Sequence, residues 1–516
     1  MDNIQILWVD DEIDLLKPHI MFLEERGYQV DTINNGSEAL DMVDDKRYDL
    51  IFLDENMPGM DGLETLGRIK TIDNAIPVVM ITKSEEESIM EDAIGSQISD
   101  YLIKPVNPKQ ILLSIKKNLD KRRLVSEKTT SNYQQEFRQI GMDLGMVNDW
   151  QGWQELYRRL IYWELQLDKL DDEGLNEILL TQKKEANSQF FKFITRNYQD
   201  WLEGDDAPVM SHTLFKEWVK PEIDKGEKLF LIVIDNLRYD QWRVMKPILD
   251  QYYLIEEEKS FYSILPTATQ YARNALFSGL MPSEIQKRFP DKWVNDTDDE
   301  GKNNYEEDFA ADQLKRLGLG DLDFSYYKIT NFNAGKKMVD QLSNILGNPF
   351  NILVYNFVDM LSHAKTDMKV IRELADNDKA YRSLTLSWFQ NSPLLDLLRI
   401  LREKGIRVLL TTDHGTINVN APTKLVGDRN VNTNLRYKLG RNMTYENKDV
   451  YRVAKPEDVF LPRPNINSEF VFAREDLFFA YPNNYNHYVK YYTNTYQHGG
   501  VSLEEMIVPF ISLSPR

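Results

Sequence analysis

The stretch Val408–Gly415, VLLTTDHG, shows how the larger part of this chain is organised. Its leading apolar residues indicate a strand buried on both faces, as in a parallel sheet covered by helices. The strand is followed by an acid–imidazole pair, Asp413 and His414, and then by a glycine. Open α/β sheets build their sites at the carboxyl ends of such strands. Because carboxylate and imidazole are common ligands of divalent metals, the pair predicts either a metal site or a simple turn cap.

Other segments present ligand-type side chains in the same manner. KLFLIVID is an apolar strand ending in Asp235, and NILVYNFVDMLSH is one followed by Asp359 and His363. A spacing of four residues puts the last two side chains on one helical face, which suits a single metal ion. A late HGG supplies His498, and PTATQYARNALFSG predicts a helix from Gln270 to Phe277. A threonine at the start of that helix lies near free backbone N–H groups, which stabilise an anion.

Each of these side chains taken alone is most simply a cap or a surface group. As a set they include three of the six histidines in the chain, which chance explains poorly. We therefore expect them to converge on one site. The set is Asp235, Thr269, Asp359, His363, Asp413, His414 and His498.

Residues 1–123 predict a separate α/β domain. Strand-like and helix-like segments alternate five times, which is typical of a doubly wound parallel sheet. Polar residues at the strand ends then lie at one edge: Asp10, Asp11, Asp54, Thr82 and Lys104. A carboxylate cluster is unfavourable unless a cation binds it, so the three aspartates predict a Mg²⁺ site.

Residues 124–205 predict a helical bundle that connects this domain to an output domain at 206–516. Aromatic and aliphatic residues recur at helical intervals in WQELYRRLIYWELQL, and such a stripe is more often core than a ligand box. The segment has no recognition helix flanked by basic residues, so we do not expect a DNA-binding output.

Composition limits the remaining possibilities. A length of 516 residues is enough for about three domains. The formal charge of −20 argues against broad binding to nucleic acid or anionic lipid, and the absence of cysteine excludes disulfides and thiolate metal sites. No apolar run approaches the ~18 residues of a membrane span, and the acidic N-terminus does not resemble a signal peptide. We expect a cytoplasmic protein without membrane insertion.

The N-terminal motifs resemble a known family. DDE, DENMPGMDG, MITK and YLIKP, in this order and spacing, resemble a two-component response-regulator receiver domain, which has a flavodoxin-like fold. The resemblance implies that Asp54 accepts a phosphoryl group from a sensor histidine kinase and that Asp10, Asp11 and Asp54 hold Mg²⁺. It further implies a phosphorylation-dependent homodimer. Its switch residues are Thr82, Tyr101 and Lys104.

The C-terminal motifs resemble a second family. A strand ending in Asp, a threonine at a helix start, Asp-x-x-x-His, Asp-His-Gly and a late His-Gly-Gly are similar to the alkaline phosphatase superfamily, and HGGVSLEEMIVPF to its PglZ branch. The whole arrangement resembles the PorX-type response regulators associated with the type IX secretion system. It implies an alkaline-phosphatase-like α/β domain with two Zn²⁺ ions. One ion takes Asp359, His363 and His498, and the other takes Asp235, Asp413, His414 and the nucleophile hydroxyl.

The nucleophile implied by this resemblance is Thr269 or Thr267. Nucleotide-cleaving relatives with a PTxT segment use the second threonine, which favours Thr269. Arg273, one turn further along the helix, is either a ligand of a phosphate oxygen or part of a surface salt bridge. Sulfate esters are disfavoured, because a sulfatase needs a cysteine or serine where this chain has threonine.

An insert between Gly415 and His498 is locally basic, with nine Lys/Arg against five Asp/Glu from Ala421 to Arg463. It predicts either a solvated loop or a lid over a polyanionic substrate. Aromatic residues from Phe470 to Tyr492 either stack bases or pack a core. The candidate substrate-binding residues of the lid are Arg429, Arg436, Lys438 and Arg441.

Two hypotheses follow for function. The first is a response regulator whose output is a zinc-dependent phosphodiesterase acting on oligonucleotide-type or cyclic-nucleotide-type phosphodiesters and regulating type IX secretion. The second is a signalling adaptor whose metal domain mainly binds a sigma factor or a secretion component. The complete set of ligand-type residues favours the enzyme.

Overall fold

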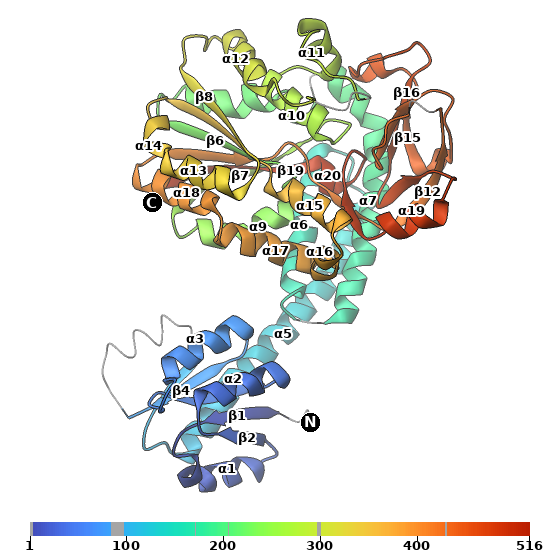
Figure 1. Ribbon diagram of the computed structural model, residues 1–516. Helices are drawn as coiled ribbons and strands as arrows, with labels where there is room; N and C mark the ends of the chain where they lie inside the picture. Colours follow the sequence, from blue (N-terminus) through green and yellow to red (C-terminus); the bar gives the residue numbers. More distant parts are fainter. Residues whose placement is uncertain (1–3, 84–97, 171, 205, 297–300, 429–430) are drawn as a thin grey trace. The chain divides into compact units, whose positions relative to one another are not determined.

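The computed structural model consists of two compact units, Met1–Gln135 and Glu136–Arg516 (Figure 1). The residues that it describes are 4–83, 98–170, 172–204, 206–296, 301–428 and 431–516.

The N-terminal unit is a five-stranded parallel sheet in the order β2-β1-β3-β4-β5. Its strands are β1 (Gln5–Val9), β2 (Gln29–Ile33), β3 (Leu50–Asp54), β4 (Val78–Thr82) and β5 (Asp100–Ile103). Its helices are η1 (Ile13–Leu16), α1 (Lys17–Glu24), α2 (Gly36–Asp45) and α3 (Gly62–Ile72). The long α5 (Pro108–Leu144) begins in this unit, and its last residues belong to the C-terminal unit. The strands are apolar on both faces because each face is packed: Leu7 and Val9 belong to one hydrophobic cluster, Ile6 and Trp8 to the other. The doubly wound fold predicted for this segment is confirmed.

Two helices, α6 (Trp150–Leu167) and α7 (Glu173–Glu203), follow α5. Asp149 and Asp172 cap their N-termini by accepting hydrogen bonds from Gly152 N and Leu175 N. The aromatic stripe of α6 is buried, which agrees with the prediction that it is core. These helices lie within the C-terminal unit, where Gln154 donates a 2.7 Å hydrogen bond to the backbone oxygen of Ser260.

A six-stranded mixed sheet, in the order β7-β19-β10-β6-β9-β8, forms the centre of the C-terminal unit. Strands β10, β6, β9 and β8 run parallel, and β19 pairs antiparallel with both β10 and β7. The strands are β6 (Leu229–Ile234), β7 (Tyr253–Tyr262), β8 (Phe324–Ile329), β9 (Phe350–Tyr355), β10 (Arg407–Thr411) and β19 (Ile507–Pro515). Every residue of β6 and β9 is buried, which explains their continuous apolar sequences.

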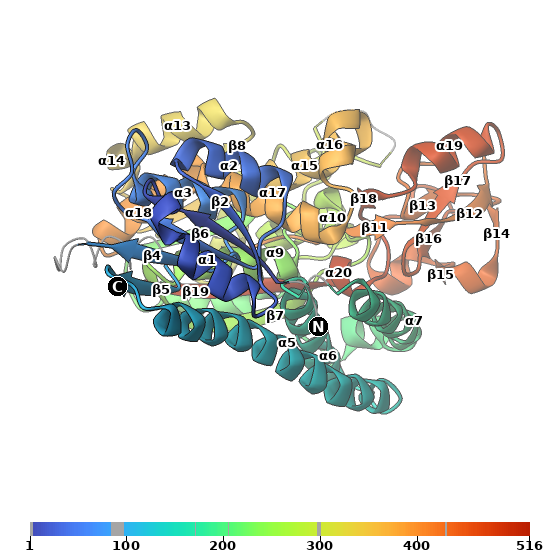
Figure 2. The ribbon, with the colours of Figure 1, turned by 90° about the horizontal axis from the view of Figure 1, so that it is seen from below.

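Helices surround this sheet in Figures 1 and 2. They are η2 (Phe215–Val219), α8 (Lys220–Ile223), α9 (Tyr239–Leu249), α10 (Thr269–Ser278), α11 (Pro282–Arg288), α12 (Glu306–Arg316), α13 (Phe332–Asp340), α14 (Leu342–Ile345), α15 (Phe357–Asp367), α16 (Lys369–Leu374), α17 (Asp378–Gln390), α18 (Pro393–Glu403) and α20 (Leu503–Met506).

The insert after Gly415 is a folded lobe, at the opposite end of the unit from α13 and α14 in Figure 2. It contains three small sheets, β11-β18, β14-β12-β17 and β13-β16-β15. Its elements are β11 (Ile417–Val419), β12 (Ala421–Val426), β13 (Tyr437–Gly440), β14 (Thr444–Tyr445), η3 (Asn447–Asp449), β15 (Val450–Val453), η4 (Pro456–Val459), β16 (Glu469–Ala473), β17 (Leu477–Ala480), α19 (Tyr485–Tyr492) and β18 (Thr495–Gln497).

Among the described residues, no helix combines the length and the apolar character that crossing a membrane requires.

Candidate functional site

The sheet topology brings the predicted ligands of the C-terminal unit to one edge. Strands β6 and β10 are parallel neighbours, with Val233 opposite Thr411, so Asp235 and Asp413 emerge side by side. Helix α15 begins after the adjacent strand β9 and carries its acid–imidazole pair, and the loop after β18 supplies the last histidine. The six predicted ligands form two groups: Asp359, His363 and His498, and Asp235, Asp413 and His414.

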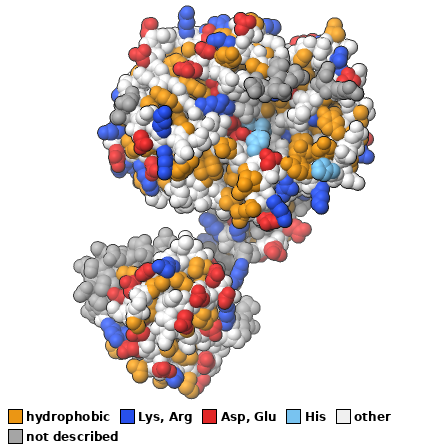
Figure 3. All heavy atoms as spheres, viewed as in Figure 1, with side chains coloured by type: hydrophobic (Ala, Val, Ile, Leu, Met, Phe, Trp, Pro, Cys, Tyr) orange, Lys and Arg blue, Asp and Glu red, His pale blue; other side chains and the backbone are white. Residues whose placement is uncertain are grey.

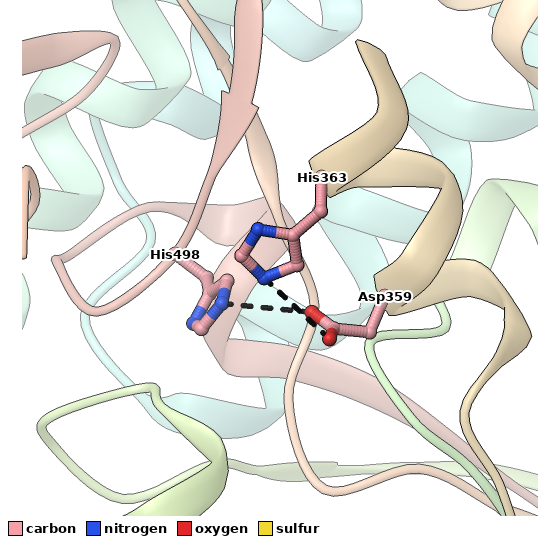
Figure 4. Close-up of side chains that lie close together, drawn as sticks. All are labelled: Asp359, His363 and His498. Carbon is pink, nitrogen blue, oxygen red and sulfur yellow. Dashed lines mark ion pairs between the residues drawn. The ribbon is translucent and has the colours of Figure 1, made fainter. Parts of the chain in front are cut away.

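Figure 4 shows the first group. Nε2 of His363 lies 3.6 Å from Oδ2 of Asp359, and Nε2 of His498 lies 3.8 Å from its Oδ1. The side chain of His363 is 68% exposed, whereas those of Asp359 and His498 are mostly buried. The group therefore opens to solvent on one side, and Figure 3 shows histidine beside acidic side chains on this face of the unit.

The second group is completely buried. Nε2 of His414 lies 3.9 Å from Oδ1 of Asp235 and 3.7 Å from Oδ2 of Asp413. The rings of His414 and His498 stack with centroids 4.3 Å apart, so the two groups adjoin.

Hydrogen bonds fix which nitrogen of each buried histidine faces the site. Nδ1 of His414 lies 3.0 Å from the backbone oxygen of Gly415, and Nδ1 of His498 lies 3.2 Å from that of Thr267. A carbonyl oxygen can only accept, so each Nδ1 carries the proton and donates it. Each Nε2 is thereby left as a lone-pair donor, the arrangement in which metal-binding histidines are oriented.

The carboxylates are suited to a cation. Among the described residues, Asp359 Oδ1 and Asp413 Oδ2 are buried oxygens without a hydrogen-bond partner, and each faces an imidazole nitrogen of its own group. Burial raises the pKa of Asp235, Asp359 and Asp413 and lowers the pKa of His498 to about 4. A divalent cation would stabilise both the ionised carboxylates and the neutral imidazoles, and this O/N donor set is one that zinc uses.

The two candidate threonines have different surroundings. Oγ1 of Thr269, at the first residue of α10, lies 3.0 Å from His414 Nε2 and 3.5 Å from Asp235 Oδ1, so it faces the second group. The Thr267 hydroxyl donates to Gly500 O and accepts from Gly499 N, both at 3.0 Å. Thr267 thus holds the loop that follows His498, and only Thr269 of the pair points its hydroxyl at the ligands.

Arg273 corrects one alternative of the sequence analysis, because it is buried rather than part of a surface salt bridge. Its Nη1 donates to Asp235 Oδ2 at 2.7 Å, and its Nε donates to Glu306 at 2.5 Å. The arginine occupies one oxygen of Asp235, so the other faces the ligands. Sequence reasoning missed Glu306, since nothing in the acidic run of NNYEEDF shows that one of its glutamates is buried.

The interpretation of the insert as a solvated loop or lid is wrong for two of its candidates. Arg436 is fully buried in an ion pair with Glu505 at 2.7 Å, and Lys438 is buried, donating to the backbone oxygen of Asn432 at 2.8 Å. Lys438 lies on β13, and Arg436, just before this strand, is held by Glu505 and by the backbone oxygens of Arg474 and Leu477. Because both side chains are buried in these contacts, neither can reach a substrate. Arg441 is 41% exposed, and Arg429 lies outside the described residues. The strand aromatics Phe470 and Phe472 are buried core residues.

The N-terminal unit gathers its predicted residues at the carboxyl edge of the sheet. Asp10, Asp11 and Asp54 cluster there, and Lys104 Nζ lies 2.9 Å from Asp10 and 3.0 Å from Asp54. Burial raises the pKa of Asp54 to about 6. The hydroxyl of Thr82, also at this edge, donates to buried Glu55.

Comparison with known families covers most of the chain. Residues 6–116 match the response regulator receiver domain, residues 123–202 the PorX response regulator linker domain, and residues 214–513 the BREX system PglZ alkaline phosphatase-like domain. The chain belongs to the PorX-type response regulators. Its output unit is a PglZ domain of the alkaline phosphatase superfamily, as predicted.

Individual relatives match over about a fifth to a quarter of the chain. The transcriptional regulatory protein ZraR of Klebsiella oxytoca is 35% identical over 140 residues, covering 27% of this chain and 32% of that protein. ResD of Bacillus subtilis is 37% identical over 112 residues, covering 22% of this chain and 46% of ResD. The chain thus spans a third to a half of these relatives. A two-component response regulator from Clostridium difficile is 32% identical, with a TM-score of 0.22, covering 23% of this chain and 96% of that chain.

Proposed function

We propose that the PglZ domain of this response regulator is a zinc-dependent phosphodiesterase. Its activity is controlled by phosphorylation of Asp54, the phosphoryl group coming from a sensor kinase. The observation that carries the proposal is the pair of adjoining ligand groups with one hydroxyl, that of Thr269, pointing at the second of them. Regulation of type IX secretion is part of the proposal and rests on the family resemblance.

The chemistry proposed is nucleophilic displacement at phosphorus. Asp359, His363 and His498 would hold one zinc ion, and Asp235, Asp413 and His414 the other. When bound, the ions supply positive charge at the phosphoryl oxygens and lower the pKa of the bound hydroxyl. Oγ1 of Thr269 would attack phosphorus and lose its proton to solvent, while the bond to the leaving oxygen breaks and the departing alkoxide takes a proton from solvent. Water then cleaves the phosphothreonine ester and restores the hydroxyl.

Diesters are the proposed substrate class, with nucleotide-type diesters the first choice. Arg273 is the one cationic side chain that the described residues of α10 place beside the second group. It is fully engaged by ion pairs with Asp235 and Glu306. It therefore leaves no free charge for the second anionic oxygen of a monoester. The nucleotide preference rests on the local basic charge of the insert, of which Arg441 remains an exposed candidate.

Metal analysis tests the proposal directly. We expect about two zinc ions per chain in the wild type and about one in His363→Ala, because that change removes one of three ligands of the exposed group. The matched control is His487→Ala, an exposed histidine on α19, which should keep both ions. The same preparations are assayed on a panel of phosphodiesters and phosphomonoesters. Absence of zinc after zinc dialysis, or equal metal loss in both variants, would contradict the assignment.

The alternative function is a signalling adaptor that binds a sigma factor or secretion component. Zinc-loaded protein that cleaves no ester in this panel would favour it.

A further inference from the structure

The short helix α20 (Leu503–Met506) lies against both loops that carry metal-ligand histidines. The backbone oxygen of Glu505 accepts a 3.1 Å hydrogen bond from the N–H of Gly415, the residue after His414. Its side-chain Oε1 accepts a 2.9 Å hydrogen bond from the N–H of Gly500, two residues after His498. Gly415 packs so closely that a Cβ there would overlap the Glu504 carbonyl oxygen. One element therefore joins a loop from each ligand group.

Glu505 itself is held rigidly. Arg436 donates to it from Nη2 at 2.7 Å and from Nε at 3.2 Å, and Ser502 Oγ donates at 2.7 Å. Both Glu505 and Arg436 are completely buried. A buried and fully paired carboxylate resists displacement, because breaking its pairing leaves an unpaired charge in a low-dielectric interior. Any movement of α20 is thus transmitted to the two loops.

Helix α7 fixes α20 from the other side. Asn187 accepts a 2.8 Å hydrogen bond from the N–H of Leu503 and donates a 3.0 Å hydrogen bond to Glu504 Oε2. One turn earlier on the same face, Lys183 Nζ lies 3.7 Å from Glu504 Oε1 and 2.8 Å from Glu164 of α6. Asn187 and Lys183 are both buried, and α7 and α20 are close together in Figures 1 and 2.

We infer that Asn187 and Lys183 are positioning residues of the metal centre: linker helix α7 sets the geometry of the two ligand loops through α20. Neither residue is one of the six candidate metal ligands, and both act through Glu504, Leu503 and the Glu505 contacts. This inference rests on the proposed function, since it concerns the zinc sites, and it gives the linker a part in that function. A change that shifts α7 changes the metal centre without altering any ligand.

The first test replaces Asn187 with Leu, which keeps the approximate volume and removes both hydrogen bonds. We expect zinc affinity, measured by competition with a chromophoric chelator, to fall roughly tenfold, the lower end of the effect of outer partners of metal ligands. With saturating zinc, kcat on a diester should fall while KM changes little. The control is Asn197→Ala, also on α7, whose side chain donates only within its helix, to Phe193 O at 2.8 Å. Its zinc affinity and kcat should equal those of the wild type.

A reciprocal pair of changes separates positioning from general damage to packing. Asn187→Asp keeps the acceptor for Leu503 N but sets a carboxylate against Glu504, so it should weaken zinc binding. Adding Glu504→Gln restores a donor–acceptor pair across the contact and should recover most of the affinity, as a double-mutant cycle detects. This pair decides the matter if Asn187→Leu fails to fold.

The outcomes are distinguishable. Recovery in the double variant supports the inference, and additive losses overturn it. If the wild type binds zinc and cleaves diesters, and Asn187→Leu does so equally well, the inference is overturned while the proposed function stands. The same holds if Asn187→Leu and Asn197→Ala lose equal amounts of zinc affinity and kcat. A wild type that binds no zinc ends the proposed function and this inference together.

Discussion

The hydroxyl of Thr269 is the single side-chain group on which the proposed enzymatic function depends. Thr269→Val keeps the shape and removes the proposed nucleophile, while Asp235, Asp413 and His414 remain in place. We expect diester cleavage to fall at least about a thousandfold with zinc content little changed, as when a covalent route is lost. The measurement is kcat on a chromogenic diester, with metal analysis of the same sample.

Thr267→Val is the matched control for that change. Its hydroxyl bonds only to the Gly499–Gly500 backbone, so its loss should lower thermal stability and reduce kcat far less than Thr269→Val. The reverse order of the two effects on kcat would show that the nucleophile is Thr267.

We expect buried Lys438 to make the stability of the folded protein depend on pH. Burial lowers its pKa to about 7, whereas the unfolded chain titrates near the ordinary value of 10.5. Between these values the unfolded state holds a proton that the folded state lacks, so this lysine destabilises the fold most near pH 7 and less as pH rises. Lys438→Met should therefore have a higher free energy of unfolding than the wild type at pH 7. This difference should shrink by about 1 kcal/mol per pH unit between pH 7 and pH 9.

Denaturant unfolding at pH 7, 8 and 9 measures this difference. The control is Lys448→Met, an exposed lysine of the same lobe, which should show no such trend. A constant difference between Lys438→Met and wild type would mean that the lysine is charged in the fold.

At the scale of elements, the sequence was most informative where a buried strand ends. The parallel strands β6, β9 and β10 are continuous apolar runs, and the carboxyl ends of parallel strands meet at one edge. For that reason the residues that the structure brings together could be named beforehand, down to the i, i+4 pair on α15. The helix predicted from Gln270 to Phe277 is α10, which ends before Gly279 in a left-handed conformation.

The insert and the linker contacts could not be predicted in this way. Strand β12 pairs with β17, placing Thr423 opposite Phe479, and such long-range pairing leaves no local pattern. A surplus of Lys and Arg therefore suggested solvent exposure, although Arg436 finds its partner Glu505 far along the chain. Asn187 is likewise an ordinary polar residue within a helical sequence, and only the fold shows that it meets α20.

For the protein as a whole, the contacts of the receiver residues suggest how the proposed phosphorylation of Asp54 would act. Lys104 is paired with both Asp10 and Asp54, and the Thr82 hydroxyl is engaged by Glu55. A phosphoryl group on Asp54 offers three acceptor oxygens, which compete for the Lys104 ammonium and the Thr82 hydroxyl. Thr82 is the last residue of β4 and Lys104 directly follows β5, the strand in which Tyr101 is half-buried. We therefore expect phosphorylation of Asp54 to change the packing, and with it the surface, of β5.

We expect that change to convert the protein to a homodimer, because exposure of one new patch most often gives a closed twofold pair. Size-exclusion chromatography with light scattering, with and without a small phosphoryl donor and Mg²⁺, measures the mass. The wild type should double in mass only when both are present, and Asp54→Ala should stay at its starting mass, since it cannot accept the group.

Thr82→Val separates phosphorylation from switching: it should still incorporate phosphate but dimerise more weakly, because the phosphoryl oxygens lose the hydroxyl that couples them to β4. A wild type that is phosphorylated yet unchanged in mass at micromolar concentration would show that the receiver signals without dimerisation.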